Sequence, residues 1–161
     1  MIDTRSKIVT QESAADKVNR WKKTGSTVVF TNGCFDLLHP GHIRYLESAR
    51  NLGDRLVLGL NDDESVRRLK GHQRPILPIE DRAEILAGLE AIDLVVPFHE
   101  DTPRTLIILL RPDILVKGGD YRISEIAGAD EVQSWGGKVK VLEFVAGKST
   151  TSIIDRIRKL V

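Results

Sequence analysis

Short apolar segments alternate with helical segments along most of the chain, and this alternation is the strongest constraint on its fold. Each apolar segment is brief and carries few polar residues, as expected for parallel strands that are buried on both faces. The predicted strands are residues 27–31, 55–60, 94–98, 114–117 and 138–144. The predicted helices are residues 40–52, 62–69, 81–90, 103–110 and 149–160, with a partly helical stretch over 123–135. Five such units predict an α/β fold with a doubly wound, five-stranded parallel sheet. The ligand of such a sheet lies beyond the carboxyl ends of its strands.

The length of the chain favours one domain. A chain of 161 residues can bury one substantial core, so we expect residues 1–161 to form a single domain. Residues 11–23 carry apolar positions at helical spacing, and Gly25 follows them. Residues 1–26 are therefore predicted to be an N-terminal helical extension of that domain.

Charge and composition exclude several classes of partner. The 24 Lys and Arg residues nearly balance the 23 Asp and Glu residues, which gives no electrostatic basis for binding nucleic acid or a membrane surface. The longest apolar run, residues 106–110, is too short to span a bilayer, and residues 1–20 lack the apolar core of a signal peptide. The single cysteine, Cys34, excludes an internal disulfide and a multi-cysteine zinc site. These features predict a cytoplasmic protein.

The segment from Thr31 to His42 joins the first predicted strand to the first long helix and carries the strongest functional signal. His39 and His42 flank Pro40 and Gly41, and proline suits the first position of a helix. The free amides that follow lie at the positive end of the helix dipole, where phosphate binds readily. We therefore expect a nucleotide site here, with the imidazoles as extra donors. A structural histidine pair is the alternative, and two histidines alone are too few for a zinc site.

Three predicted helices begin their apolar stripe with a hydrogen-bond donor in the first turn. These donors are His42, Arg82 and Thr150. Because a helix that follows a parallel strand begins near the carboxyl end of that strand, we expect the three donors to converge on the ligand crevice. Ordinary capping is the alternative. The helix over 103–110 offers no such donor and is expected only to pack. The apolar positions of the three stripes are Tyr45, Leu46 and Ala49; Ile85, Leu86 and Leu89; and Ile153, Ile154 and Ile157.

Two further lysines are predicted to lie near the ligand. Lys70 belongs to a basic loop, where we favour contact with an anionic substrate over a solvated role. Lys117 ends a buried strand and precedes Gly118 and Gly119, which permit close backbone approach to a ligand. A plain turn is the alternative at this position.

The segment from Gly147 to Thr150 is similar to the end of a phosphate-binding P-loop. The P-loop pattern needs a glycine five positions before Gly147, and Leu142 stands there. We therefore interpret Ser149 and Thr150 as a helix cap or a phosphate clamp.

These motifs together resemble the signature of the cytidylyltransferase-like nucleotidyltransferases. The matching segments are Gly33-Cys34-Phe35-Asp36, His39-Pro40-Gly41-His42 and Ser149-Thr150-Thr151. The similarity to the D-glycero-D-manno-heptose 1-phosphate adenylyltransferases within this family extends to Asn61-Asp62-Asp63, Arg74-Pro75-Ile76, the segment from Lys117 to Tyr121, and Gly147-Lys148. The resemblance implies a Rossmann-like nucleotidyltransferase fold. It also implies transfer of an adenylyl group from ATP to heptose 1-phosphate, which gives ADP-heptose and pyrophosphate for lipopolysaccharide synthesis.

The resemblance and the motifs together predict the site. The residues expected to be catalytic are His39, His42 and Lys70. The residues expected to bind nucleotide are Thr31, Asn32, Gly33, Phe35, Gly41, Lys117, Gly118, Gly147, Ser149 and Thr150. The residues expected to bind the sugar phosphate are Asp36, Asn61, Arg82, Asp120 and Tyr121. Mg²⁺ is expected to arrive with ATP rather than in a protein cage, so no metal ligand is predicted. The resemblance further implies a stand-alone homo-oligomer and a separate upstream heptose kinase.

Two alternative functions remain open at this point. One is a cytidylyltransferase that acts on another small polyol phosphate such as glycerol 3-phosphate. Those enzymes usually carry Arg-Thr-Glu-Gly before the last motif, whereas residues 144–147 are Phe-Val-Ala-Gly, which favours adenylyl transfer. The other is a non-catalytic nucleotide-binding regulatory module, against which the intact histidine pair argues.

Overall fold

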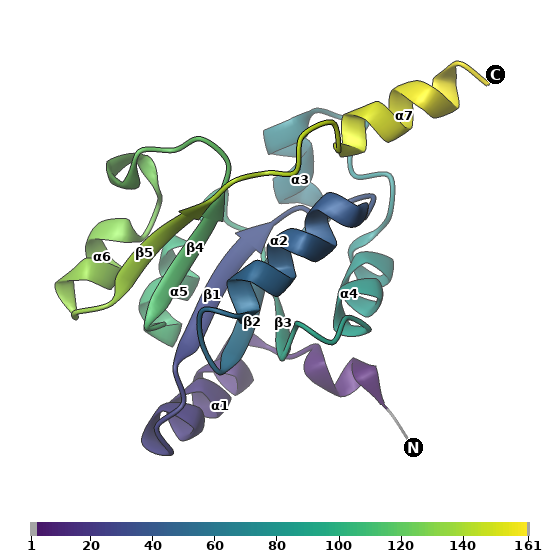
Figure 1. The fold of residues 1–161 in the computed structure, drawn as a ribbon. Coiled ribbons are helices and arrows are strands. Elements are labelled where there is room, and N and C mark those ends of the chain that lie inside the picture. Colours follow the sequence, from purple (N-terminus) through teal and green to yellow (C-terminus); the bar gives the residue numbers. More distant parts are fainter. Residues whose placement is uncertain (1–2, 161) are drawn as a thin grey trace.

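A parallel sheet of five strands forms the centre of the molecule (Figure 1). The computed structural model describes residues 3–160. The strands are β1 (Val28–Gly33), β2 (Arg55–Asn61), β3 (Leu94–Phe98), β4 (Ile114–Gly118) and β5 (Lys138–Leu142). They pair in parallel in the order β3-β2-β1-β4-β5, which confirms the predicted doubly wound sheet. The winding direction changes between β1 and β4, and ligands of open α/β sheets bind at such a point.

One helix precedes β1, and a helix follows each of the five strands as predicted. They are α1 (Gln11–Lys23), α2 (Pro40–Arg50), α3 (Asp63–Lys70), α4 (Ile79–Ala87), α5 (Arg104–Leu110), α6 (Ala129–Ser134) and α7 (Thr150–Arg158), with 3₁₀ turns η1 (Thr4–Lys7) and η2 (Ile123–Glu125). Helix α4 begins two residues earlier and ends three residues earlier than the predicted range 81–90, because Pro78 is its N-cap and Gly88 its C-cap. No helix within residues 3–160 is long and apolar enough to cross a membrane.

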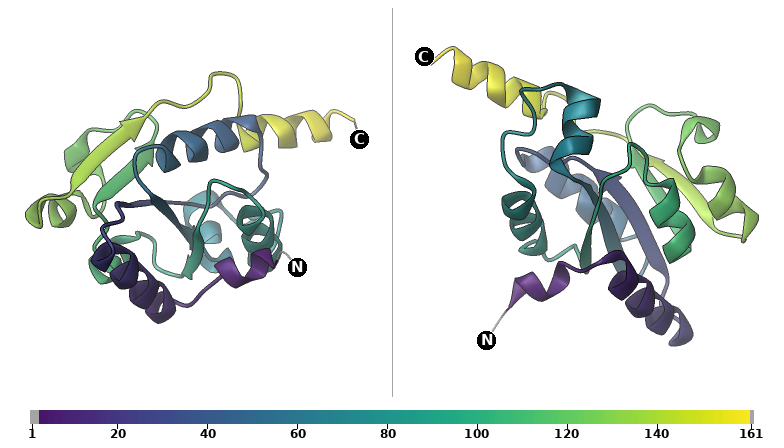
Figure 2. Two further views of the ribbon diagram at one scale, coloured as in Figure 1. Left: turned by 60° about the horizontal axis from the view of Figure 1, so that its bottom comes forward. Right: turned by 180° about the vertical axis from the view of Figure 1, so that it is seen from behind.

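Two apolar layers enclose the sheet. Alternate side chains of β1 enter different layers, because Val28 and Phe30 pack with α1, α5 and α6, whereas Val29 packs with α2 and α4. Figure 2 shows α1 and α5 in front of the sheet when the molecule is seen from behind. Ala14 and Val18 of α1 are fully buried, so the segment predicted as an N-terminal extension is part of the first layer.

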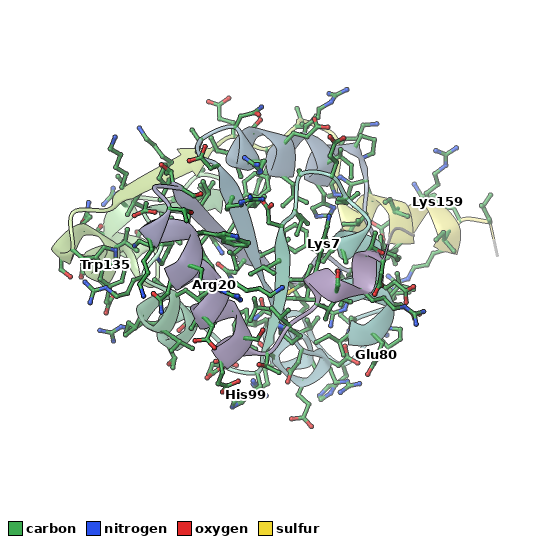
Figure 3. All side chains as sticks on the ribbon, turned by 90° about the horizontal axis from the view of Figure 1, so that it is seen from below. Lys7, Arg20, Glu80, His99, Trp135 and Lys159 are labelled. Atoms are coloured by element: carbon green, nitrogen blue, oxygen red, sulfur yellow. The ribbon has the colours of Figure 1, made fainter. Side chains whose placement is uncertain are left out.

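Aspartates hold the amino-terminal edge of the sheet, opposite the ligand crevice. Asp54, Asp93 and Asp113 accept hydrogen bonds at 2.7–2.8 Å from backbone amides at the starts of β1 and β2. Figure 3 views this side, where Arg20 lies on α1 and Lys7 on η1. These contacts fix the starts of β1 and β2, at the edge of the sheet opposite the carboxyl ends.

Helix α7 does not bury its apolar isoleucine stripe in the core. None of its residues is buried, and Ile157 is 52% exposed. Figures 1 and 2 show α7 extending away from the body of the molecule. The stripe of α4 is also displaced, because Ala83 and Leu86 are buried while Ile85 is 45% exposed. Helical spacing predicts a shared face, but it does not determine what that face meets.

Candidate active site

A cavity of about 690 Å³ opens at the carboxyl ends of the central strands. Asn32 and Gly33 of β1, Asn61 of β2, and Lys117 and Gly118 of β4 contribute to its wall. The cavity therefore lies at the change of winding direction, where the fold predicts a ligand.

Two stacked imidazoles form one wall of the cavity. His39 is the N-cap of α2, and its Nδ1 accepts a hydrogen bond from the Gly41 amide at 3.1 Å. The ring of His42 stacks on it, with ring centroids 3.9 Å apart and planes at 28°. Because His39 Nδ1 is an acceptor, a neutral His39 carries its proton on Nε2, where it can be donated to a ligand.

Both imidazoles are neutral near pH 7. Burial, followed by the neighbouring His39, lowers the pKa of His42 to about 4. Burial and the nearby Lys148 ammonium also lower the pKa of His39. Within the residues that the structure describes, His42 Nδ1 is buried without a hydrogen-bond partner. The site therefore contains a buried polar atom that has no hydrogen-bond partner. Such atoms are rare in folded proteins, so this one marks a candidate functional position.

At the cavity, the start of α7 lies against the segment that precedes α2. Thr150 Oγ1 donates to the Leu37 carbonyl at 3.1 Å, and Ser149 caps α7 by accepting from the Ser152 amide at 3.0 Å. A Cβ added to Gly41 would lie 2.9 Å from the His39 ring and 3.3 Å from Lys148 Cβ, so only glycine fits closely between these side chains. His42 and Thr150 both line the cavity, and the two motifs therefore converge as predicted.

Positive charge dominates the cavity lining. Lys70, Arg74, Lys117 and Lys148 border it. Burial lowers the pKa of Lys117, an effect that Cys34 opposes and Lys70 reinforces. Two bordering carboxylates are already paired, Asp36 with Arg74 at 2.6 Å and Asp101 with Arg68 at 2.7 Å. Glu125 is the third carboxylate of the lining, and it forms no ion pair within residues 3–160. Lys70, Lys117 and Lys148 also form none, and because these three cations outnumber one carboxylate, the cavity is suitable for a polyanion.

The role predicted for Arg82 as a substrate-binding residue needs correction. Its side chain is fully buried and lies outside the cavity lining. Its guanidinium donates to the carbonyls of Cys34, Asn61 and Leu77 at 2.6–3.0 Å and to Asp63 Oδ1 at 2.7 Å. Arg82 therefore ties the ends of β1 and β2 to α4, and four of its five N–H groups are used inside the protein. Helical spacing cannot distinguish such an internal tie from a residue that faces a ligand.

Asp36 was also predicted to bind substrate, but its carboxylate forms hydrogen bonds within the protein. Its buried carboxylate accepts from Arg74 Nε at 2.6 Å and from the amides of Ile76 and Leu77 at 2.8–2.9 Å. Burial raises the pKa of Asp36, but these hydrogen bonds and Arg74 outweigh burial and hold the pKa below its ordinary value. Asp36 therefore orders the segment between α3 and α4 as an anion.

Three other predicted residues lie outside the cavity lining. Thr31 is fully buried, and its hydroxyl hydrogen-bonds the hydroxyl of Tyr45 at 2.7 Å. Asp120 and Gly147 are exposed in the loops after β4 and β5. The predicted residues that do line the cavity are Asn32, Gly33, Phe35, Asp36, His39, Gly41, His42, Asn61, Lys70, Lys117, Gly118, Tyr121, Ser149 and Thr150.

The structure adds residues that sequence reasoning missed. Arg74 and Lys148 lie within matching motifs, so their basic character was a usable signal. Phe144 follows β5 with 65% of its surface exposed, and nothing in the sequence indicated that it borders a ligand. Thr102 and Pro103 also line the cavity, although the helix that they precede was expected only to pack.

Comparison with known proteins identifies the family. The profile of the family described as Cytidylyltransferase-like matches residues 30–156. The chain belongs to the cytidylyltransferase-like family. This membership confirms the family resemblance and makes the chain a nucleotidyltransferase.

Several relatives of this cytidylyltransferase-like chain share one name. It is 59% identical over 152 residues to the bifunctional protein HldE of Syntrophotalea carbinolica, with 94% of this chain and 31% of that protein covered. Identity to HldE of Haemophilus influenzae is 55% over 153 residues, with 95% and 32% covered. The chain therefore spans about a third of the length of these curated relatives.

A solved structure shares the fold of this cytidylyltransferase-like chain. It is a lipopolysaccharide core biosynthesis protein from Thermoplasma volcanium, with a TM-score of 0.62 and 29% identity. The match covers 75% of this chain and 98% of that one. The likeness supports the Rossmann-like architecture.

Proposed function

We propose that this chain transfers an adenylyl group from ATP to D-glycero-D-manno-heptose 1-phosphate, and that it releases ADP-heptose and pyrophosphate. The observation that carries the proposal is the meeting of the stacked His39 and His42 rings with Thr150 around one cationic cavity. Similarity to HldE proteins and to a lipopolysaccharide core biosynthesis protein supports a heptose acceptor and a role in lipopolysaccharide synthesis. The sequence Phe-Val-Ala-Gly at 144–147 favours ATP over CTP as donor.

The proposed reaction is one in-line displacement at the α-phosphorus of ATP. An oxygen of the sugar phosphate forms the new bond to this phosphorus, and the bond to the bridging oxygen of the β-phosphate breaks. Pyrophosphate leaves with the electron pair. The attacking phosphate is already an oxyanion because its second pKa is about 6, so no general base is required. The protein must position the two anions and neutralise their charge.

Each donor has a task in the proposed reaction. His42 donates to the α-phosphate and His39 Nε2 to the β- and γ-phosphates, both as neutral imidazoles whose pKa burial has lowered. The beginning of α7 holds the departing pyrophosphate through free backbone amides and the Ser149 hydroxyl. Thr150 orders this turn, because its own hydroxyl proton is donated to the Leu37 carbonyl. Lys70 bridges the incoming phosphate.

Magnesium is proposed to enter as part of the MgATP substrate. Within residues 3–160, no group of three His, Cys, Asp or Glu side chains is placed to hold a metal ion. Mg²⁺ commonly takes most of its ligands from phosphate oxygens and water, so a nucleotide complex requires no protein cage.

A pyrophosphate-release assay tests the proposal. ATP and CTP are each combined with heptose 1-phosphate and with glycerol 3-phosphate. Release with ATP and heptose 1-phosphate, well above the other three pairs, is the expected result. Faster release with CTP and glycerol 3-phosphate would replace the proposal with the cytidylyltransferase alternative. Nucleotide binding without pyrophosphate release from any pair would favour a regulatory module.

We further propose that residues 1–161 form a single cytoplasmic domain and that the chain acts as a homo-oligomer. Because the proposed acceptor is a phosphate monoester, a heptose kinase must act upstream. Light scattering of the purified chain measures the oligomeric state directly.

A further inference from the structure

Arg74 is held differently from the other cations that line the cavity. Its Nε donates to Oδ2 of Asp36 at 2.6 Å, and the Asp36 side chain has no exposed surface. The Arg74 side chain itself is 16% exposed and borders the cavity. Within residues 3–160, Lys70 and Lys148 form no ion pair. The fold therefore positions one guanidinium by an ion pair, whereas the ammonium groups of Lys70 and Lys148 have no such partner within residues 3–160.

The anchor of Arg74 extends to its backbone. Asp36 also accepts from the amides of Ile76 and Leu77, so the segment after Arg74 wraps around the same carboxylate. The Leu77 carbonyl in turn accepts from Arg82 Nε at 3.0 Å. A side chain that is fixed in this way loses little conformational entropy when a ligand binds, which increases its contribution to affinity.

The anchored guanidinium keeps most of its donors. A guanidinium carries five N–H groups, of which the Nε–H is used by Asp36. Among the residues that the structure describes, no acceptor is paired with Nη1 or Nη2 of Arg74. These two groups form the planar fork that matches two oxygens of a phosphate, a geometry that lysine cannot supply.

The position of Arg74 relates it to the acceptor rather than to the nucleotide. Lys70 is the last residue of α3, and Arg74 lies in the segment between α3 and α4, so both come from the part of the chain that follows β2. Lys117 lies in β4 and Phe144 follows β5, on the other side of β1. The α2 and α7 starts supply donors for one polyphosphate, and a reaction that joins two phosphates needs a second cationic set.

We propose that Arg74 binds the phosphate of the acceptor through its Nη1 and Nη2 groups, and that Asp36 is the positioning residue that aims it. Two phosphate oxygens contact the fork, and a third is left to attack the α-phosphorus. This inference rests on the proposed function, because it assumes that the acceptor is a phosphate monoester.

Kinetics of Arg74→Ala and Arg74→Lys test the inference. We expect Arg74→Ala to raise the KM for heptose 1-phosphate roughly 10- to 100-fold, as for loss of charge-assisted hydrogen bonds, while the KM for ATP changes less than about 2-fold. Arg74→Lys restores charge without the fork and is expected to recover only part of the loss. Arg67→Ala is the matched control, because it removes one positive charge from an exposed position of α3 outside the cavity. A rise in the KM for ATP alone would overturn the assignment.

Asp36→Asn tests the positioning role separately. The amide keeps the shape of the side chain but loses the charge that holds Arg74. We expect the acceptor KM to rise while the KM for ATP is retained, in a variant shown to be folded by circular dichroism. A lower melting temperature with an unchanged acceptor KM would reduce Asp36 to a purely structural residue and refute its positioning role.

Binding measurements separate this inference from the proposed function. Calorimetry with heptose 1-phosphate alone, and with ATP alone, compares wild type with Arg74→Ala without requiring turnover. Selective loss of heptose 1-phosphate affinity supports the Arg74 assignment, and equal affinity in both proteins refutes it. Absence of pyrophosphate release by the wild type would count against the proposed reaction and leave this comparison standing.

Discussion

The hydroxyl of Thr150 donates a hydrogen bond to the carbonyl oxygen of Leu37 at 3.1 Å, although 113 positions separate the two residues. Leu37 precedes His39 in the connection from β1 to α2, and Thr150 is the first residue of α7. Because no residue of α7 is buried, this contact at its first turn is an important link between the helix and the histidine motif. The bond therefore couples the two halves of the candidate phosphate site.

Loss of this bond is expected to impair both order and activity. Thr150→Ala removes the hydroxyl, whereas Thr150→Ser retains it and serves as the control. One such bond contributes about 1 kcal/mol, so we expect roughly 5- to 10-fold slower pyrophosphate release. Amide hydrogen exchange over residues 150–158 should become faster in the same variant. Equal activity and exchange in the alanine and serine variants would show that the contact is incidental.

His42→Ala is expected to lower turnover roughly 10²- to 10³-fold, in the range found when a preorganised donor to a developing charge is removed. The fold should persist, because the ring lies at the cavity wall rather than within either apolar cluster. Turnover and far-ultraviolet circular dichroism are measured together. His99→Ala is the control, since the His99 side chain is exposed (Figure 3). His99 is also not among the residues that line the cavity. Full activity of His42→Ala would remove the role assigned to this residue.

The histidine pair also predicts how stability depends on pH. Burial and His39 lower the pKa of His42 from 6.5 to about 4 in the folded state. Between these values the unfolded chain binds more protons than the folded chain, so the free energy of unfolding falls as pH falls. After a discount for partial solvent exposure, we expect His42 to account for about 1–2 kcal/mol between pH 7 and pH 4.5.

Urea unfolding at several pH values measures this dependence. His42→Asn removes the titrating group, so its unfolding free energy should fall less steeply with acidification than that of the wild type. The comparison isolates His42, because His39 titrates in both proteins. Parallel curves for the two proteins would contradict the lowered pKa.

Arg82 is predicted to act on stability rather than on substrate affinity. Arg82→Met keeps the length of the side chain but removes hydrogen bonds to three carbonyls and to Asp63. Loss of one partner from a buried ionic network costs about 3–5 kcal/mol, so we expect a large fall in the unfolding free energy. Arg44→Ala, at an exposed position on α2, is the control. A stable Arg82→Met variant with a raised acceptor KM would instead support direct contact with substrate.

Local signals in the sequence determined the strands, most helix starts and the histidine motif. Apolar β-branched segments predict buried strands, and Pro40 marks the start of α2, because both signals act between near neighbours in the chain. His39 and His42 are three positions apart, so their proximity follows from local geometry. The family could be predicted for the same reason, since its motifs are contiguous.

Only the tertiary structure decided how the longer side chains are used. Arg82 and Arg74 are both basic and lie near the site. Arg82 donates its hydrogen bonds to backbone carbonyls inside the protein, whereas Arg74 borders the cavity. The isoleucine stripe of α7 has helical spacing but meets no core. Periodicity establishes which residues share a face, whereas the partner of that face depends on residues distant in the chain. The free energy of each buried charge or apolar surface is therefore determined by long-range packing.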